Sequence, residues 1–279
     1  MVEKKFFTEV VLLTKSYNLQ DFKDWLHWHM DIIGFQRCHV FDNESSVDIK
    51  TECQKYGERV TYELVKGWPN QYALYNRYIN NESPAWWVLP IDDDEFLYVS
   101  KRYGHRVNNC ILDTTLKHPD WCKVCVGWRN LFPEKFTEER VNPHLVLNAT
   151  AWSNEASEIW QCGNRPVKTF VHLAYHYDWA DRNNQHRTHN PFVIGCDKPG
   201  YTLNNEAIVG SWQVKPTIGN EDLILYHYQF KCNTEWKMKC ENRKSPGAIS
   251  FNKNFPQLYT KLYTHNELSI DSRAFLLWN

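Results

Sequence analysis

Four consecutive acidic residues, Asp92 to Glu95, stand between an apolar run at 86–91 and another at 96–98. Neighbouring carboxylates repel one another by roughly 1 kcal/mol per pair even near a wet surface, so we expect a positive group beside them. A divalent cation fits, because Mg²⁺ and Mn²⁺ bind one or two carboxylates together with substrate phosphates. A solvated acidic turn is the simpler alternative, but the apolar segments on both sides disfavour it.

The spacing of the acids suggests which of them bind the cation. In an extended chain, residues two apart share a face. We therefore predict that Asp92 and Asp94 hold the cation and the diphosphate of a substrate. Asp93 is predicted to point away and to matter least, while Glu95 either supports the metal ligands from behind or supports the turn.

Two further polar clusters could complete such a site. Asp42 and Asn43 follow a predicted strand, and their side chains could hydrogen-bond a nucleoside base or ribose, although an Asx turn is the simpler interpretation. His227 also stands at a predicted strand end and is followed by Lys231 and Lys239. The histidine could be a third metal ligand and Lys231 could steady a diphosphate leaving group; without the acids this would be a solvated basic turn.

The segment 172–189 contains four histidines among aromatic residues, in a spacing that matches no zinc pattern. We interpret these histidines as packing or hydrogen-bonding residues. Asp178 and Asp181 in this segment are candidate general bases, because partial burial raises the pKa of a carboxyl group. Asp178 is the first choice, with Asp181, Glu155 and Glu158 as alternatives.

Composition excludes several classes of protein. The 279 residues include 32 Lys and Arg against 33 Asp and Glu, so there is no basic footprint for nucleic acid. Nine scattered Cys form no disulfide framework, and the single pair Cys122 and Cys125 lacks the second pair of a zinc finger. Motifs for a P-loop, a dinucleotide fold and a serine nucleophile are absent from the sequence.

The N-terminal residues contain no apolar signal segment, and no stretch is long enough for a membrane anchor, so we expect a cytoplasmic protein. Asn43 falls in a glycosylation sequon and also in the predicted substrate site. A glycan there would obstruct the site, which also favours the cytoplasm.

The first hundred residues alternate between strand and helix patterns. Predicted strands cover 9–14, 35–41, 60–65 and 86–91, and predicted helices cover 19–33, 47–56 and 71–80. This alternation predicts an α/β fold with a mainly parallel, Rossmann-like central sheet flanked by helices. Ligands bind beyond the carboxyl ends of such strands, so Asp42 and the acidic run are expected to face one crevice.

The remaining sequence has a looser pattern. Strands are predicted at 123–128, 167–173, 208–212 and 223–228, with a helix at 235–240. There is no internal repeat or low-complexity linker, so we predict one domain over residues 1–279. Residues 1–100 would bind the diphosphate substrate and the metal, and residues 101–279 would bind the second substrate.

The order of these motifs resembles the GT-A type nucleotide-sugar glycosyltransferases, particularly families 2 and 92. The resemblance covers about residues 9 to 100 well and 120 to 240 loosely. It rests on Trp25, His29, Gly34-Phe35, Val40 to Ser46, Trp87-Val88 with Asp92, Asp94, Glu95 and Phe96, and on the weaker blocks Trp128-Arg129, Val167-Lys168 and His227-Tyr228 with Lys231 and Lys239. Two departures concern nucleotide recognition: Lys15 to Asn18 replaces the family's K-N-E, and Glu44 replaces its usual glycine.

The resemblance implies an inverting transferase that uses a UDP-sugar and Mn²⁺ or Mg²⁺. Asp92, Asp94 and His227 would bind the metal, and Asp42 would contact uridine. The family suggests transfer of a hexose or pentose, such as galactose or xylose, to a glycan hydroxyl, for example on a fucose of an N-glycan core. The rival interpretations are a metal-dependent phosphohydrolase or nucleotidyltransferase and a non-catalytic carbohydrate-binding protein. The sequence does not indicate the oligomeric state.

Overall fold

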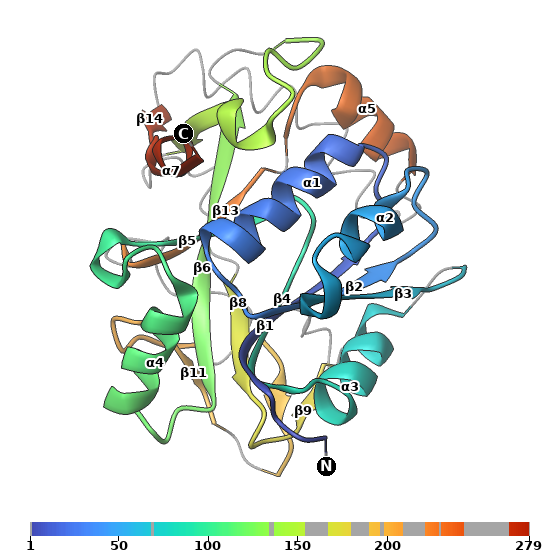
Figure 1. Cartoon of the computed structure of the whole chain (residues 1–279). Helices are drawn as coiled ribbons and strands as arrows, with labels where there is room; N and C mark the ends of the chain where they lie inside the picture. Colours follow the sequence, from blue (N-terminus) through green and yellow to red (C-terminus); the bar gives the residue numbers. More distant parts are fainter. Residues whose placement is uncertain are drawn as a thin grey trace.

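The computed structural model describes residues 2–67, 70–133, 137–153, 167–179, 190–195, 198–208, 221–228, 230–242 and 268–278. The α/β fold class predicted from the sequence is confirmed, because a large central sheet is flanked by helices (Figure 1). None of the helices in these ranges is both long and apolar enough to cross a membrane.

The first hundred residues fold as the predicted alternation of strands and helices. The elements are β1 (Phe6–Thr14), α1 (Leu19–His27), β2 (Arg37–Asp42), α2 (Ile49–Gln54), β3 (Val60–Leu64), α3 (Gln71–Asn81) and β4 (Ala85–Ile91). The four strands are parallel and lie in the order β4-β1-β2-β3. Their carboxyl ends therefore meet at one edge of the sheet, where Asp42 and the acidic run follow.

The central strand β1 shows why this sheet is covered on both faces. Val10 and Leu12 pack in one core cluster with Phe22 of α1, whereas Val11 packs in another cluster with Tyr75 of α3. Successive side chains of a strand point to opposite faces, so the two clusters lie on opposite sides of the sheet. An apolar run such as 10–13 is typical of a strand buried in this way.

Helix α1 begins at a cap and continues into a π-helical turn, Trp28–Ile32. The Asn18 side chain accepts hydrogen bonds from the backbone N–H groups of Gln20 and Asp21, which caps the first turn. The chain then reverses at Gly34, whose φ of +79° suits glycine. At 1.5 Å per residue the helical segment is about 20 Å long, so it connects opposite ends of the sheet.

The second half extends the sheet with strands of both directions. Its elements are β5 (Glu95–Val99), α4 (Val107–Lys117), β6 (Lys123–Pro133), β7 (Ala149–Ser153), β8 (Val167–His172), β9 (Tyr177–Asp178), β10 (Phe192–Val193), β11 (Gly200–Tyr201), β12 (Ala207–Ile208), β13 (Leu223–His227), α5 (Asn233–Asn242), β14 (Leu268–Ile270) and α7 (Arg273–Trp278), with 3₁₀ turns at Gly57–Arg59, Lys101–Tyr103 and Leu145–Leu147. Strand β8 lies antiparallel between β4 and β6. Strand β13 lies between β5 and β6, antiparallel to the first and parallel to the second.

The second half differs from the sequence predictions at several elements. Helix α4 was not predicted, and strand β6 continues beyond the predicted end at 128 to Pro133. Of the strand predicted at 208–212, the structure describes only Ile208, which is the last residue of β12.

Candidate functional site

A cavity of about 650 Å³ lies at the carboxyl ends of β1, β2 and β4. The loop after β1 and the start of α1 form one wall, Asn43 follows β2, and Asp93 and Asp94 follow β4. The opposite wall comes from the second half of the chain. It consists of Glu139, Arg140, Lys231, Thr234, Glu235, Trp236 and Met238. The prediction that the two polar clusters face the same crevice is confirmed for Asn43, Asp93 and Asp94, whereas Asp42 and Asp92 do not line the cavity.

The acidic residues form a turn, so the prediction of an extended segment was wrong. Residues 92–94 lie between β4 and β5 and have no strand geometry. The Asp92 backbone N–H donates to Glu95 Oε2 at 2.8 Å, and the Glu95 N–H donates to the Asp92 carbonyl at 3.2 Å. In a turn, adjacent residues can face the same side. Asp93 lines the cavity with Asp94 and accepts a 2.6 Å hydrogen bond from the Thr14 hydroxyl, so it does not point away.

Asp92 is held by a buried lysine from β8. The Lys168 ammonium lies 2.9 Å from Asp92 Oδ2 and 3.5 Å from Glu95 Oε2. Burial raises the pKa of Glu95, and nearby Lys168 opposes this only in part. Burial alone would lower the pKa of Lys168, but the two carboxylates reverse this and raise it. The positive group expected beside the acidic run is therefore present within the chain.

Asp94 lies opposite the imidazole of His227, at the end of β13. Nε2 of His227 is 3.4 Å from Asp94 Oδ1, while Nδ1 is 2.8 Å from Asn130 Oδ1. Because Asn130 Oδ1 is an acceptor, Nδ1 carries the ring proton, and Nε2 faces the carboxylate. Two ligands at right angles on a Mg²⁺-sized ion lie about 3 Å apart, given bonds of about 2.1 Å, so this pair fits such an ion.

The three predicted metal ligands are not gathered around one point. Among the residues that the structure describes, no three His, Cys, Asp or Glu side chains are placed to share a metal ion. Asp94 and His227 fit as a pair, whereas Asp92 is ion-paired with Lys168. Mg²⁺ takes its remaining ligands from water and substrate phosphates, so two protein ligands are sufficient.

Asp42 has a structural role in the turn after β2. Oδ1 accepts a hydrogen bond from the Ser45 backbone N–H at 2.8 Å, and Oδ2 accepts one from the Tyr62 hydroxyl at 2.7 Å. The hydrogen bond to Ser45 reaches one residue further than in the Asx turn considered for the sequence, but it stabilises the turn in the same manner. Asp42 is buried and does not line the cavity, but its neighbour Asn43 does. The Asn43 Oδ1 atom is buried and has no hydrogen-bond partner within the described structure, which is unusual for an amide oxygen.

Lys231 belongs to a cluster of charges that joins the two walls of the cavity. Its ammonium lies 2.5 Å from Asp21 Oδ2, and Arg140 binds both Asp21 and Glu235, at 2.6 Å from each. Burial alone would raise the pKa of Asp21, but Lys231 and Arg140 more than offset this and hold it below its usual value. Lys239 lies in α5, outside the residues whose side chains are described.

The charged residues that line the cavity carry a formal charge of −2. Three are cations, Lys15, Arg140 and Lys231, and five are carboxylates, Asp21, Asp93, Asp94, Glu139 and Glu235. Such a cavity repels a diphosphate unless a cation enters with it. Its charge therefore suits a complex of a divalent cation with a nucleoside diphosphate.

The structure does not bring Asp178 to this cavity. Strand β9 packs beside α3, where Asn80 Oδ1 accepts a hydrogen bond from the Tyr177 backbone N–H at 2.8 Å. Asn80 precedes the amino end of β4, and the acidic turn follows its carboxyl end, about 20 Å away for a strand of this length. The alternatives Asp181, Glu155 and Glu158 lie outside the described residues, as do His186 and His189.

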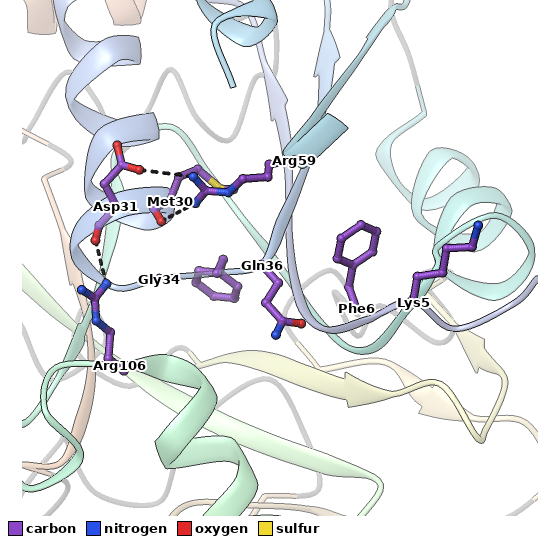
Figure 2. Close-up of a pocket in the computed structure, with 9 residues that line it drawn as sticks. Lys5, Phe6, Met30, Asp31, Gly34, Gln36, Arg59 and Arg106 are labelled. Atoms are coloured by element: carbon purple, nitrogen blue, oxygen red, sulfur yellow. Dashed lines mark hydrogen bonds and ion pairs between the residues drawn. The ribbon is translucent and has the colours of Figure 1, made fainter. Parts of the chain in front are cut away.

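A second hollow, of about 610 Å³, lies at the amino ends of β1 and β2 (Figure 2). Arg59 donates to the Met30 carbonyl at 2.7 Å, and Arg106 donates to the carbonyls of Asp31 at 2.7 Å and Ile32 at 3.1 Å. These carbonyls belong to the last turn of the π-helical segment. The two arginines therefore cap a helix C-terminus, where carbonyl groups lack partners within the helix.

Sequence reasoning missed Lys168, Arg140 and Asp21 as parts of the site. A lone lysine in the apolar strand 167–173 was a usable signal, since buried lysines need a negative partner. Arg140 had no comparable signal, because its segment has no regular pattern. The six cysteines whose side chains are described, including Cys122 and Cys125, are all buried.

No protein-family model matches the sequence, and no curated protein matches it. The crystal structure of residues 1–349 of S. aureus TarS aligns with 87% of this chain and 68% of its own, at 10% identity and a TM-score of 0.40. The same fragment in complex with UDP aligns with 60% of this chain, at 15% identity and a TM-score of 0.34. The 4-diphosphocytidyl-2C-methyl-D-erythritol synthase of Anaerococcus prevotii aligns with 49%, at 13% identity and a TM-score of 0.29.

The chain spans only 47% of the UDP-bound fragment and 59% of the synthase. At such identities and TM-scores the alignments carry no argument about activity. The functional assignment therefore depends on the cavity.

Proposed function

We propose that this protein is a metal-dependent glycosyltransferase of the GT-A type that takes its sugar from a nucleoside diphosphate donor. The observation that carries the proposal is the cavity at the carboxyl ends of the parallel strands. Its wall has a formal charge of −2 and includes Asp94, whose carboxylate lies 3.4 Å from His227. A diphosphate needs a cation to enter such a cavity, and Asp94 and His227 are the residues that would hold one.

A bound Mn²⁺ or Mg²⁺ would neutralise the diphosphate as it leaves the sugar. On the protein side, Lys231 and Arg140 hold positive charge at the opposite wall, within reach of a phosphate oxygen. Asp21 keeps both cations in position through its two ion pairs. Asp92 remains a predicted third ligand, which would have to exchange Lys168 for the metal.

We propose UDP as the nucleotide, with Asn43 as its contact after β2. The Asn43 Oδ1 atom is buried in the structure without a hydrogen-bond partner, and an N–H group of a base would satisfy it. Asp42, originally predicted to contact uridine, would act by holding the turn through Ser45 and Tyr62. A galactosyl or xylosyl donor and a glycan acceptor, such as a fucose of an N-glycan core, remain proposals from the family resemblance.

An inverting transfer also requires a base that takes the proton of the acceptor hydroxyl. We propose Glu139 for this role, because it is exposed at the cavity and its Oε1 already accepts a hydrogen bond from the Thr234 hydroxyl at 2.8 Å. For Asp178 to act as the base, the acceptor would have to reach the amino end of β4. Glu139→Gln should lower kcat while leaving the affinity for the nucleotide unchanged.

The proposal is tested by thermal shift with UDP-, GDP- and TDP-sugars, each with Mn²⁺ and with EDTA. A ligand that binds only the folded state raises the melting temperature according to its affinity. We expect UDP-sugars to stabilise the protein only in the presence of Mn²⁺. Equal stabilisation in EDTA would reject the metal requirement. Release of free phosphate from many nucleotides, without a sugar acceptor, would favour a phosphohydrolase, and glycan binding without UDP binding would favour a binding protein.

A further inference from the structure

We propose that Lys168 is an internal counter-ion that competes with the divalent cation for Asp92 and so makes metal binding depend on the nucleotide diphosphate. This inference rests on the proposed function, because it concerns the same site. Lys168 would act as a positioning residue: it does not line the cavity, and it acts through Asp92 and Glu95.

Lys168 reaches the acidic turn from the neighbouring strand β8. It occupies the second residue of β8, which pairs antiparallel with β4 through Val88 and Val171. This pairing brings the ammonium to the carboxyl end of β4 from inside the protein. The Lys168 side chain is 2% exposed, and its ammonium lies 2.9 Å from Asp92 Oδ2.

Glu95 fixes the positions of Lys168 and Asp92 relative to each other. It is completely buried, and its Oε2 lies 3.5 Å from the Lys168 ammonium while accepting the Asp92 backbone N–H at 2.8 Å. Lys168 and Glu95 together thus hold both the backbone and the side chain of Asp92. A buried lysine is costly without a negative partner, so Lys168 keeps Asp92 in place as long as no other cation competes for that carboxylate.

The ion pair between Lys168 and Asp92 limits the ligands that remain for a metal ion. The Asp92 side chain is 38% exposed but does not line the cavity, so its carboxylate would have to turn toward Asp94 to reach a metal ion there. While it is paired with Lys168, only Asp94 and His227 form a two-ligand pair, and no three such side chains converge in the described structure. Two protein ligands bind Mn²⁺ weakly, and the diphosphate supplies the others. Metal and nucleotide are therefore expected to bind together.

The test measures Mn²⁺ affinity without nucleotide, by the electron paramagnetic resonance signal of free Mn²⁺. Lys168→Met releases Asp92, and we expect the variant to bind Mn²⁺ alone about tenfold more tightly than the wild type. The factor by which UDP increases the affinity for Mn²⁺ should shrink in the same proportion. Lys168→Arg keeps the charge and should behave like the wild type. Adding Asp92→Asn to Lys168→Met should abolish the gain, because the released ligand is then missing.

Far-UV circular dichroism of each variant excludes a gain that arises from carboxylates exposed by unfolding. Unchanged or weaker Mn²⁺ binding by Lys168→Met would overturn the inference, as would a gain that persists with Asp92→Asn. If Lys168→Met does not fold because Glu95 is left unpaired, the double variant Glu95→Gln, Lys168→Met removes that buried charge and is judged by the same criteria. Failure of the wild type to bind UDP with Mn²⁺ would reject the proposed function, but the comparison with Mn²⁺ alone would still decide the role of Lys168.

Discussion

The cavity and the second hollow lie at opposite ends of the same helical segment and differ in how their charges are matched. At the hollow, Arg59 and Arg106 donate to backbone carbonyls of the last helical turn, so their partners are supplied by the chain. At the cavity, the wall carries a formal charge of −2, which an entering cation would balance. Two hollows of similar volume thus have different chemistry, and volume alone does not identify a binding site.

The direction of the dipole of helix α1 agrees with this difference between the cavity and the hollow. Asn18, Leu19 and Asp21 at the N-terminal end of α1 line the cavity, whereas Met30 and Asp31 at the C-terminal end line the hollow. A helix N-terminus favours anions and a C-terminus favours cations. The hollow already holds its cations, the two arginines, while the cavity presents the helix end that suits a phosphate. Four substitutions test this contrast.

The largest effect is expected for Asp94→Asn. The variant keeps the shape of the side chain but removes the charge that faces His227. We expect it to bind UDP with Mn²⁺ at least about 100-fold more weakly, as measured by calorimetry, because a metal ligand is lost. Asp31→Asn at the hollow is the matched control and should bind like the wild type. An equal loss in both variants would remove the distinction between the two hollows.

Lys231→Gln should have the next largest effect. Its ammonium lies 2.5 Å from Asp21 Oδ2 in the cavity wall, and we expect the affinity for UDP with Mn²⁺ to fall about tenfold when this charge is lost. Lys5→Gln removes an exposed cation from the hollow and serves as the control. The comparison would fail if the change at Lys5 weakened UDP binding as much as the change at Lys231.

Gly34→Ala tests the hollow as a structural element. The residue has a φ of +79°, and an added Cβ would lie 2.9 Å from Arg106 Nη1. We expect the free energy of unfolding to fall by about 1–2 kcal/mol in urea titrations, with unchanged UDP affinity in the folded protein. Gly104→Ala has a φ of +62° and no atom near the added Cβ, so the difference between the variants isolates the contact with Arg106. A loss of UDP affinity in Gly34→Ala would contradict this expectation and show that the hollow and the cavity are energetically coupled.

The smallest effect concerns pH. The pKa of Asp21 is lowered in the folded protein, so its contribution to stability is present above its unfolded pKa of about 3.8 and is lost as the pH falls through the folded value. Asp21→Asn lacks this contribution, so the difference in unfolding free energy from the wild type should shrink between pH 5 and pH 2. Urea titrations at several pH values, with Asp31→Asn as control, measure this. A difference that does not change with pH would show that the ion pairs of Asp21 do not contribute.

The first hundred residues were predictable because their signals are local. Strand β1 is continuously apolar, and Asn18 and Gly34 mark the two ends of a helical segment. Helix α4 also has buried residues at helical spacing, Val107, Cys110 and Ile111, but the polar residues between them weaken the pattern. Predictions that used only the spacing of residues along the chain were therefore correct mainly for the positions of helices and strands.

The details of the site depend on contacts between segments that are distant in the sequence. The spacing of residues along the chain does not indicate these contacts. Asp92 turned out to face Lys168 because of the pairing between β4 and β8. Asp93 lines the cavity because residues 92–94 form a turn, which the alternation rule of an extended chain does not describe. Asp178 failed to reach the cavity because the position of β9 depends on its packing against α3.

Strand β13 has a consequence for the biosynthesis of the protein. In the described residues β5 pairs with β13, and the carbonyl of Asp94 accepts a 2.7 Å hydrogen bond from the Tyr228 N–H. A ribosome releases β5 long before β13, so the nascent chain carries an unpaired sheet edge while residues 100–222 are synthesised. Such edges promote aggregation, and pairings of high sequence separation form slowly. A premature stop codon before Leu223 would therefore yield a product prone to association, even though every residue of the acidic turn had been translated.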